Sequence, residues 1–218
     1  KDMKKLFYML IIMCSFFLLA GFTEDDFDID GYDQYQKEYK SESIGACSAS
    51  STKTYEDYKG ITAVGSAQYK YIHEHMTVTE TGLLIDEDGF IGAALAYDFG
   101  PIGSRYYFEF DTGIVLPIVK VDAKSSAHTP NGCHAYDGSV IEFVIDTETA
   151  LEYFSIKGNG LVNNGNFNNY KGLSGKIVDI EKVSDEKLEA GVTYEDKVVD
   201  DHTEIREDTR NVINIEGG

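Results

Sequence analysis

Carboxyl side chains are the strongest candidates for chemistry in this sequence. Asp122 ends the apolar run 114–121 and is followed by a loop of small residues, and Glu142 lies in a second apolar run. Partial burial raises the pKa of a carboxyl group toward the value that a general acid needs. Asp122 is therefore a candidate general acid. The alternative is a charge-paired strand end, if the neighbouring Lys120 and Lys124 share its face.

Two other motifs suggest chemistry and have simpler explanations. An Asp-Thr-Gly motif stands at 111–113. An aspartic protease needs two such loops to share one proton, so a protease would have to be a dimer. Because Asp and Gly between two alternating apolar runs signal a hairpin, we interpret the motif as a turn. His73 and His75 lack the i, i+4 spacing of a helical zinc site, and we interpret them as surface residues.

One segment resembles half of a calcium site. Residues 26–31, Asp-Phe-Asp-Ile-Asp-Gly, match the first six positions of an EF-hand loop. The twelfth position should be a bidentate Glu and is Lys37. We interpret the segment as a solvated acidic linker and expect neither a metal nor a cofactor.

Two cysteines follow the N-terminal region, Cys47 and Cys133. In an exported protein such a pair predicts a disulfide, and closing so long a loop stabilises the fold by roughly 4 kcal/mol in the chain-entropy model. The alternative is a nucleophilic thiol in the segment Asn-Gly-Cys-His, as in the L,D-transpeptidases. His128 lies too close in sequence to be the distant His partner of that site.

Composition excludes some partners. The chain has 218 residues, with 19 Lys and Arg against 38 Asp and Glu, and a formal net charge of -19. Phosphate contacts need clustered cations, so we expect no nucleic-acid binding. The charge also opposes docking onto an anionic surface without intervening cations. With 42% hydrophobic residues, the chain can bury the core of one domain, and we expect a monomer.

The N-terminal residues predict export. Lys4 and Lys5 precede an apolar run that extends to Phe22, which is typical of a secretory signal peptide over 1–22. Cleavage near Ala20 fits, but Leu18 is a poor residue three positions before the cut, so an uncleaved anchor remains an alternative. We expect a secreted or envelope protein.

Charge and periodicity divide the remainder. We expect an acidic linker over 23–45, a folded domain over 46–183 and an acidic tail over 184–218. Within the domain, 157–175 is rich in Asn and Gly. We interpret it as an irregular surface loop or, alternatively, as a polar rim in which Asn164 and Asn166 bind sugar hydroxyls.

Short alternating runs predict a mainly β domain. Apolar residues alternate between Gly- or Asp-rich breaks, which is typical of strands, and the predicted strands are 83–85, 90–96, 105–110, 114–122, 139–146 and 176–180. Two short helices are expected, over 66–76 with Ser66 as a cap and over 147–154 with Thr147 as a cap. Several short strands with few helices favour a compact barrel.

The run 99–124 followed by 136–146 resembles the three-aspartate domain of bacterial cell-wall proteins, over about 89–150. The resemblance implies a six-stranded double-psi β-barrel, also found in lytic transglycosylase A, rare lipoprotein A and the expansins. The three acids of the family would fall on Asp98, Asp122 and Glu142. The sequence departs from the family pattern where Glu142 replaces an Asp, where Ala123 and Lys124 follow the central acid, and where an insertion carries Cys133.

The same resemblance implies action on cell-wall glycan. A lytic transglycosylase would use Asp122 as general acid and base on peptidoglycan, with Glu142 and Asp98 tuning its proton affinity. We add Lys120 and Lys124 to the Asn residues as candidate substrate-binding side chains. The alternative, from another functional class, is an expansin-like module that binds wall polysaccharide without catalysis.

Overall fold

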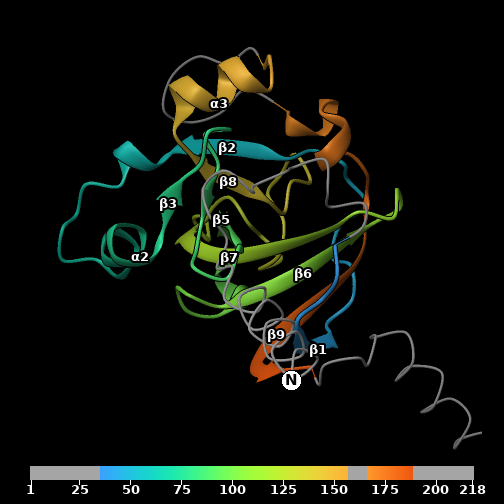
Figure 1. Cartoon of the computed structure of the whole chain (residues 1–218). Coiled ribbons are helices and arrows are strands. Elements are labelled where there is room, and N and C mark those ends of the chain that lie inside the picture. The colour runs from blue at the N-terminus through green and yellow to red at the C-terminus, as the bar shows by residue number, and fades with distance from the viewer. Residues whose placement is uncertain (1–34, 157–165, 189–218) are drawn as a thin grey trace, which may run out of the picture.

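The computed structural model of the protein describes residues 35–156 and 166–188. It is mainly β, with nine strands in one mixed sheet and two short α-helices (Figure 1). The strands are β1 (Tyr39–Ser43), β2 (Thr54–Asp57), β3 (Thr77–Val78), β4 (Leu84–Ile85), β5 (Ile91–Leu95), β6 (Arg105–Phe110), β7 (Val115–Ala123), β8 (Glu142–Ile145) and β9 (Ile177–Lys187). The helices are α2 (Ala67–His75) and α3 (Thr147–Tyr153), with 3-10 turns at η4 (Tyr58–Gly60), η5 (Tyr97–Phe99), η6 (Phe167–Asn169) and η7 (Lys171–Leu173).

The strands pair in the order β1-β9-β6-β7-β5-β4-β3, and β8 joins β5 to β2. Two pairs are parallel, β5 with β7 and β2 with β8, and the other pairs are antiparallel. The prediction of a mainly β domain with two short helices is confirmed. The predicted closure into a six-stranded barrel is not among the pairings of the described residues, which form an open sheet.

Strand β7 is the central element, and it is buried along most of its length between β5 and β6. The turn 111–113 joins it to β6, where Gly113 adopts a φ of 84° and its N–H donates to the Phe110 carbonyl. A positive φ is easy for Gly and costly for other residues, which explains Gly at this position. The interpretation of the Asp-Thr-Gly motif as a hairpin turn is confirmed.

Both helices begin at side-chain caps. The Ser66 hydroxyl accepts a hydrogen bond from Tyr69 N at 3.1 Å, as the sequence predicts. The second helix differs, because the cap of α3 is Asp146, whose carboxylate accepts from Thr149 N at 3.2 Å, rather than Thr147. Asp is among the strongest N-cap residues, so it takes this position one residue earlier. No helix within the described ranges is long and apolar enough to cross a bilayer.

The folded region extends beyond the predicted limits of 46–183. Strand β1 lies within the predicted linker, and β9 runs to Lys187. In β1, Tyr39 is the single buried residue, so the strand carries no apolar alternation that a sequence pattern could detect. The predicted signal peptide, the EF-hand-like segment at 26–31 and most of the predicted acidic tail lie outside the described residues.

The sheet buries side chains on both faces. One core cluster includes Ile91, Phe108 and Phe143, and the other includes Phe90 and Val119. Burial on both faces explains why central strands such as β5 are buried at every residue, beyond the alternation from which the strands were predicted.

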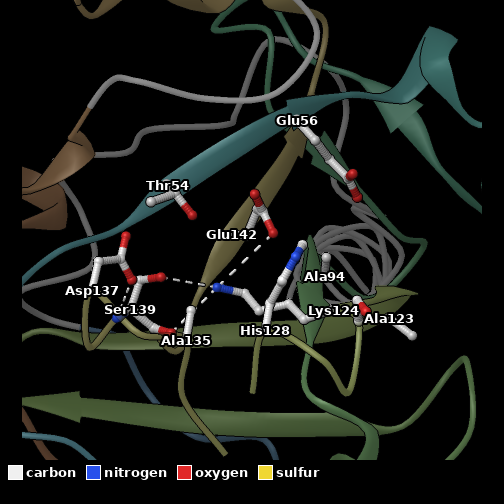
Figure 2. Close-up of a pocket in the computed structure, with 11 residues that line it drawn as sticks. Thr54, Glu56, Ala94, Ala123, Lys124, His128, Ala135, Asp137, Ser139 and Glu142 are labelled. Atoms are coloured by element: carbon white, nitrogen blue, oxygen red, sulfur yellow. Dashed lines mark hydrogen bonds and ion pairs between the residues drawn. The ribbon is translucent and has the colours of Figure 1, made fainter. Parts of the chain in front are cut away.

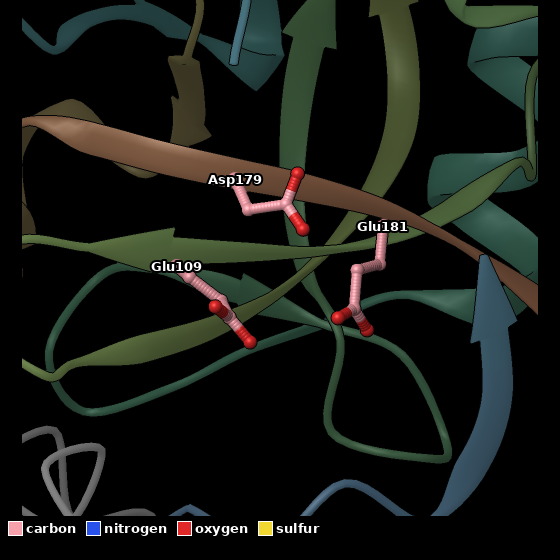
Figure 3. Close-up of side chains that lie close together, drawn as sticks. All are labelled: Glu109, Asp179 and Glu181. Atoms are coloured by element: carbon pink, nitrogen blue, oxygen red, sulfur yellow. The ribbon is translucent and has the colours of Figure 1, made fainter. Parts of the chain in front are cut away.

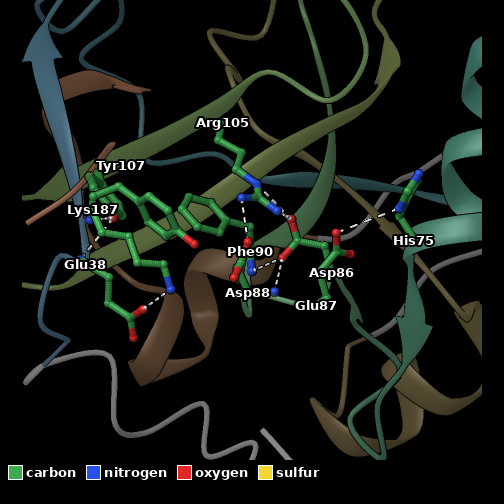
Figure 4. Close-up of polar contacts among 10 residues, drawn as sticks. Glu38, His75, Asp86, Glu87, Asp88, Phe90, Arg105, Tyr107 and Lys187 are labelled. Atoms are coloured by element: carbon green, nitrogen blue, oxygen red, sulfur yellow. Dashed lines mark hydrogen bonds and ion pairs between the residues drawn. The ribbon is translucent and has the colours of Figure 1, made fainter. Parts of the chain in front are cut away.

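A network of charged side chains links the turn between β4 and β5 to strand β6 (Figure 4). The Arg105 guanidinium on β6 donates to Asp86 from Nε at 3.0 Å and from Nη2 at 2.7 Å, and its Nη1 donates to Asp88 at 2.7 Å. The Asp86 side chain is fully buried and also accepts from Phe90 N at 2.8 Å. The buried charge of Asp86 is therefore paired and hydrogen-bonded, and it fixes the start of β5.

Candidate active site

A cavity of about 220 Å³ opens beside β2, β5 and β8 and is bounded by the loop that follows β7 (Figure 2). Most of its lining is polar or charged, and the side chains that matter for chemistry are Thr54, Glu56, Lys124, His128, Asp137 and Glu142. Such a concave site with converging ionisable groups is the best candidate for a functional site among the described residues.

The strand register brings two predicted acids together. Ala94 on β5 is the partner of Asp122 on β7 and also of Glu142 on β8, and Glu142 is in turn the partner of Thr54 on β2. Partners in neighbouring strands point to the same face of a sheet. Asp122 and Glu142 therefore flank the small side chain of Ala94, which leaves room for the cavity.

A register shift in β7 directs Asp122 to this face. Ala93 pairs with Lys120, whereas the next residue, Ala94, pairs with Asp122 and skips Val121. Adjacent residues of β5 point to opposite faces, so their partners Lys120 and Asp122 also do. A bulge re-aims side chains in this way, and without it Lys120 and Asp122 would share a face.

Glu56 is a third carboxyl at the site and was not predicted. It lies two residues after Thr54 on β2, and its Oε1 is buried without a hydrogen-bond donor in the described structure. Burial, followed by the negative charge of Asp122 and a hydrogen bond to it, raises the pKa of Glu56 to about 9. The charge of Glu142 adds to this effect, and that of Lys124 opposes it.

Lys124 supplies the ammonium of the cavity. Its Nζ lies 3.9 Å from Oε2 of Glu142 and donates to the hydroxyl of Ser139 at 3.1 Å (Figure 2). Burial lowers the pKa of Lys124, against the charges of Glu142, Asp137 and Glu56. Burial likewise raises the pKa of Glu142, although Lys124 opposes that rise. The partly desolvated ammonium of Lys124 therefore interacts electrostatically with three carboxyl groups, those of Glu142, Asp137 and Glu56.

The loop wall between β7 and β8 is held at two points. Cys133 forms a disulfide with Cys47, with Cα atoms 6.2 Å apart across 86 residues of sequence. Near the other end, the Ser48 hydroxyl donates to the Gly138 carbonyl at 2.7 Å. The predicted disulfide is confirmed. It includes the Cys133 sulfur, which the alternative prediction treated as a free nucleophile.

The remaining predicted residues lie elsewhere. Lys120 is 2% exposed, and its Nζ donates to the carbonyls of Ala96 and Gly100 at 2.8 Å, so it supports the turn after β5 rather than lining the cavity. Asp98 is exposed and does not line the cavity. A Cβ atom at Gly132 would come within 1.8 Å of Oδ2 of Asp98, which shows how closely its carboxyl lies against the Cys133 loop.

Of the two Asn residues predicted to bind sugar, Asn164 and Asn166, only Asn166 lies among the described residues. Asn166 caps η6, since its Oδ1 accepts from Asn168 N at 3.0 Å, and it also accepts from Lys53 N at 3.1 Å. This side chain holds the start of β2 in place and does not line the cavity. Asn164 lies outside the described residues.

A second acidic cluster lies on the paired strands β6 and β9 (Figure 3). Carboxylate oxygens of Glu109, Asp179 and Glu181 lie within 4.8 Å of one another. The Lys37 ammonium pairs with Glu109 and, at 2.9 Å, with Glu181. Because this cation already pairs with two of the three carboxylates, we assign no metal ion to the cluster.

Comparisons with known proteins assign no family. None of the family models that were searched matches the chain, and no curated protein matches it either. The function therefore has to be argued from the geometry of the site.

Proposed function

We propose that the protein cleaves the glycan strands of a cell-wall polysaccharide, namely peptidoglycan, with Asp122 as general acid and base. The observation that carries the proposal is the row of Asp122, Ala94 and Glu142 across three strands, in which Glu142 lines the cavity and Asp122 adjoins it through its interaction with the lining residue Glu56. Cleavage of a glycosidic bond needs a proton donor for the leaving oxygen and negative charge near the oxocarbenium-like transition state. Two neighbouring carboxyl groups in different environments can supply these two functions.

The proposed reaction uses one proton twice. Protonated Asp122 donates to the glycosidic oxygen between N-acetylmuramic acid and N-acetylglucosamine while the bond to the anomeric carbon breaks. The Asp122 carboxylate then takes the proton from the C6 hydroxyl of the muramic residue, whose oxygen bonds to the anomeric carbon and closes a 1,6-anhydro ring. Atoms and charge balance without a water molecule as nucleophile.

Glu142 and Lys124 would adjust the charge of this site. A Glu142 carboxylate stabilises positive charge that develops on the sugar ring, and the nearby ammonium of Lys124 keeps Glu142 ionised more readily than burial alone would allow. Lys124 also donates to Ser139 in the loop wall, which holds the ammonium in position.

An exposed aromatic ring supports a sugar as the ligand. Tyr136 is 77% exposed and stands between Ala135 and Asp137, which both line the cavity. An exposed aromatic face offers apolar area on which the apolar face of a pyranose ring can stack. A glycan chain that crosses the cavity would meet this ring next to the acids.

The double-psi barrel is part of the same proposal. Parallel and antiparallel pairs occur in one sheet, with β5 parallel to β7 and antiparallel to β8. An up-and-down barrel has antiparallel neighbours throughout, so the mixed pairing favours the more complex barrel that the sequence resemblance implies. The signal-like N-terminal sequence and the disulfide support export to the cell envelope.

The decisive experiment incubates the purified protein with purified peptidoglycan and measures 1,6-anhydro sugar ends by mass spectrometry. Asp122→Asn should lower the rate at least about a hundredfold, because an amide cannot donate and retake a proton. Asp111→Asn is the matched control, since Asp111 lies at the hairpin turn and its Oδ1 accepts from Lys176 N, which an amide oxygen can still do. The control should keep wild-type activity.

Two results would contradict the proposal. Wild-type protein that binds the wall without producing anhydro ends favours the expansin-like binding module. Equal loss of activity in the Asp111 and Asp122 variants would show that the assay reports stability rather than proton transfer.

A further inference from the structure

We propose that Glu56 and Asp122 hold one proton between them, so that Glu56 is the proton-sharing partner of the general acid. This inference rests on the proposed function for its catalytic meaning, but the proton pair itself can be tested without substrate. Glu56 belongs to β2 and lies outside the segment that resembles a known family.

The buried, unpaired oxygen of Glu56 favours a proton on this carboxyl group. Oε1 of Glu56 is buried, and within residues 35–156 and 166–188 no N–H or O–H group donates to it. Two ionised carboxylates cannot hydrogen-bond to each other, and an unpaired buried acceptor is costly. A proton on Glu56 would let its carboxyl donate to Asp122, which removes the repulsion and gives the pair a hydrogen bond.

The charges around the pair favour the same state. The charged or titratable groups that surround Glu56 or line its cavity are Asp122 from β7, Glu142 from β8, and Lys124, His128 and Asp137 from the loop between β7 and β8. The charge of Lys124 opposes protonation of Glu56, yet its Nζ donates to Ser139 and lies 3.9 Å from Glu142. Burial and the charge of Asp122 raise the pKa of Glu56 to about 9, so it is protonated at neutral pH.

The shared proton has a chemical use in glycan cleavage. The shared proton moves from Glu56 to Asp122, and Asp122 donates it to the leaving oxygen, so the Glu56–Asp122 pair becomes two carboxylates and gains one negative charge. That pair readily recovers a proton, which in the proposed reaction comes from the C6 hydroxyl of the sugar. Glu56 thus helps Asp122 to take the proton from the C6 hydroxyl, and it does not contact the leaving group.

The direct test is a 13C NMR titration of the Glu56 carboxyl carbon in the folded, wild-type protein. We expect an apparent pKa above about 7 for the pair, and a fall of that pKa in Asp122→Asn, which removes the neighbouring negative charge. Glu56 that titrates near its ordinary value of 4.5 in the wild type would overturn the inference.

A second test uses stability and does not depend on spectral assignment. A carboxyl whose pKa rises on folding, here from 4.5 to about 9, contributes stability that is present below 4.5 and is lost as pH rises through 9. The melting temperature of the wild type should fall across this window, and Glu56→Gln should show a smaller fall. Glu74→Gln on the exposed face of α2 is the control and should follow the wild type.

The outcomes separate the two proposals. A raised carboxyl titration with no anhydro-sugar product keeps the proton pair and rejects glycan cleavage. Anhydro-sugar product from a protein in which Glu56 titrates normally keeps glycan cleavage and rejects the pair. If both hold, Glu56→Gln should shift the pH profile of the cleavage rate, which a merely structural role would not do.

Discussion

The charge balance of the cavity determines how many of its carboxyl groups are ionised. Glu56 and Glu142 line a cavity in which Lys124 supplies the single ammonium among the described lining side chains, and Asp122 interacts with Glu56. If all three carboxyl groups were ionised, the site would carry excess negative charge in a partly desolvated environment, which is costly. Protonation of one carboxyl relieves this cost, so the composition of the site favours an acid that is loaded at neutral pH.

Removal of the ammonium gives a prediction for single residues. Lys124→Met keeps most of the length of the side chain but leaves Glu142 without its cation, so the variant should lose roughly 3 kcal/mol of unfolding free energy at neutral pH. Urea denaturation measures the loss. Adding Glu142→Gln should restore part of it, because the unpaired charge is gone, and strictly additive effects of the two substitutions would contradict the pairing.

Asp122 and Glu142 could be found from sequence because each follows or interrupts an apolar strand pattern. Glu56 could not, since β2 is four residues long and joins the site through its parallel pairing with the distant β8. Lys120 was predicted at the site because simple alternation places it on the same face of the sheet as Asp122. The register shift in β7 puts the two side chains on opposite faces.

Among the elements, the loop between β7 and β8 depends most on a covalent link. It carries Lys124, Asp137 and Ser139 into the cavity, and the Cys47–Cys133 disulfide ties it to the segment before β2. Loops of this length are costly to order without such constraints. The disulfide therefore supports both the stability of the domain and the shape of one cavity wall.

The double variant Cys47→Ser with Cys133→Ser tests this dependence. It should lose roughly 4 kcal/mol of unfolding free energy, because the unfolded chain regains the freedom that the closed loop removes. Equilibrium denaturation of the oxidised wild type and the variant gives the difference, and wild type treated with a thiol reductant should behave like the variant. An unchanged denaturation midpoint would show that the fold holds the loop without the disulfide.

Strands with apolar patterns were predictable, and strands without them were not. The predicted run 105–110 coincides with β6, and 114–122 differs from β7 by one residue at each end. In contrast, β1 is polar and exposed except for Tyr39, and β3 has two exposed residues, so their pairing depends on neighbouring strands. Sequence alone could not show which strands pair, because parallel partners such as β2 and β8 lie far apart in the chain.

At the scale of the whole molecule, charge opposes the proposed substrate. The net charge of -19 repels an anionic wall polymer at long range, although the sugar contacts at the cavity are local. Screening shortens this repulsion, since the Debye length falls from about 30 Å at 0.01 M salt to about 8 Å at 0.15 M. The molecule should therefore work better where salt or divalent cations screen its surface.

This reasoning predicts that binding to purified peptidoglycan with attached anionic polymer becomes tighter as salt rises from about 0.01 M to about 0.15 M, because screening removes more repulsion than it removes attraction. A sedimentation assay with washed wall material measures the bound fraction. Neutral glycan stripped of the anionic polymer is the control, and its binding should change little with salt. Weaker binding to the intact wall at higher salt would mean that attraction between opposite charges dominates, and the acidic surface would then have to recognise cationic groups of the wall.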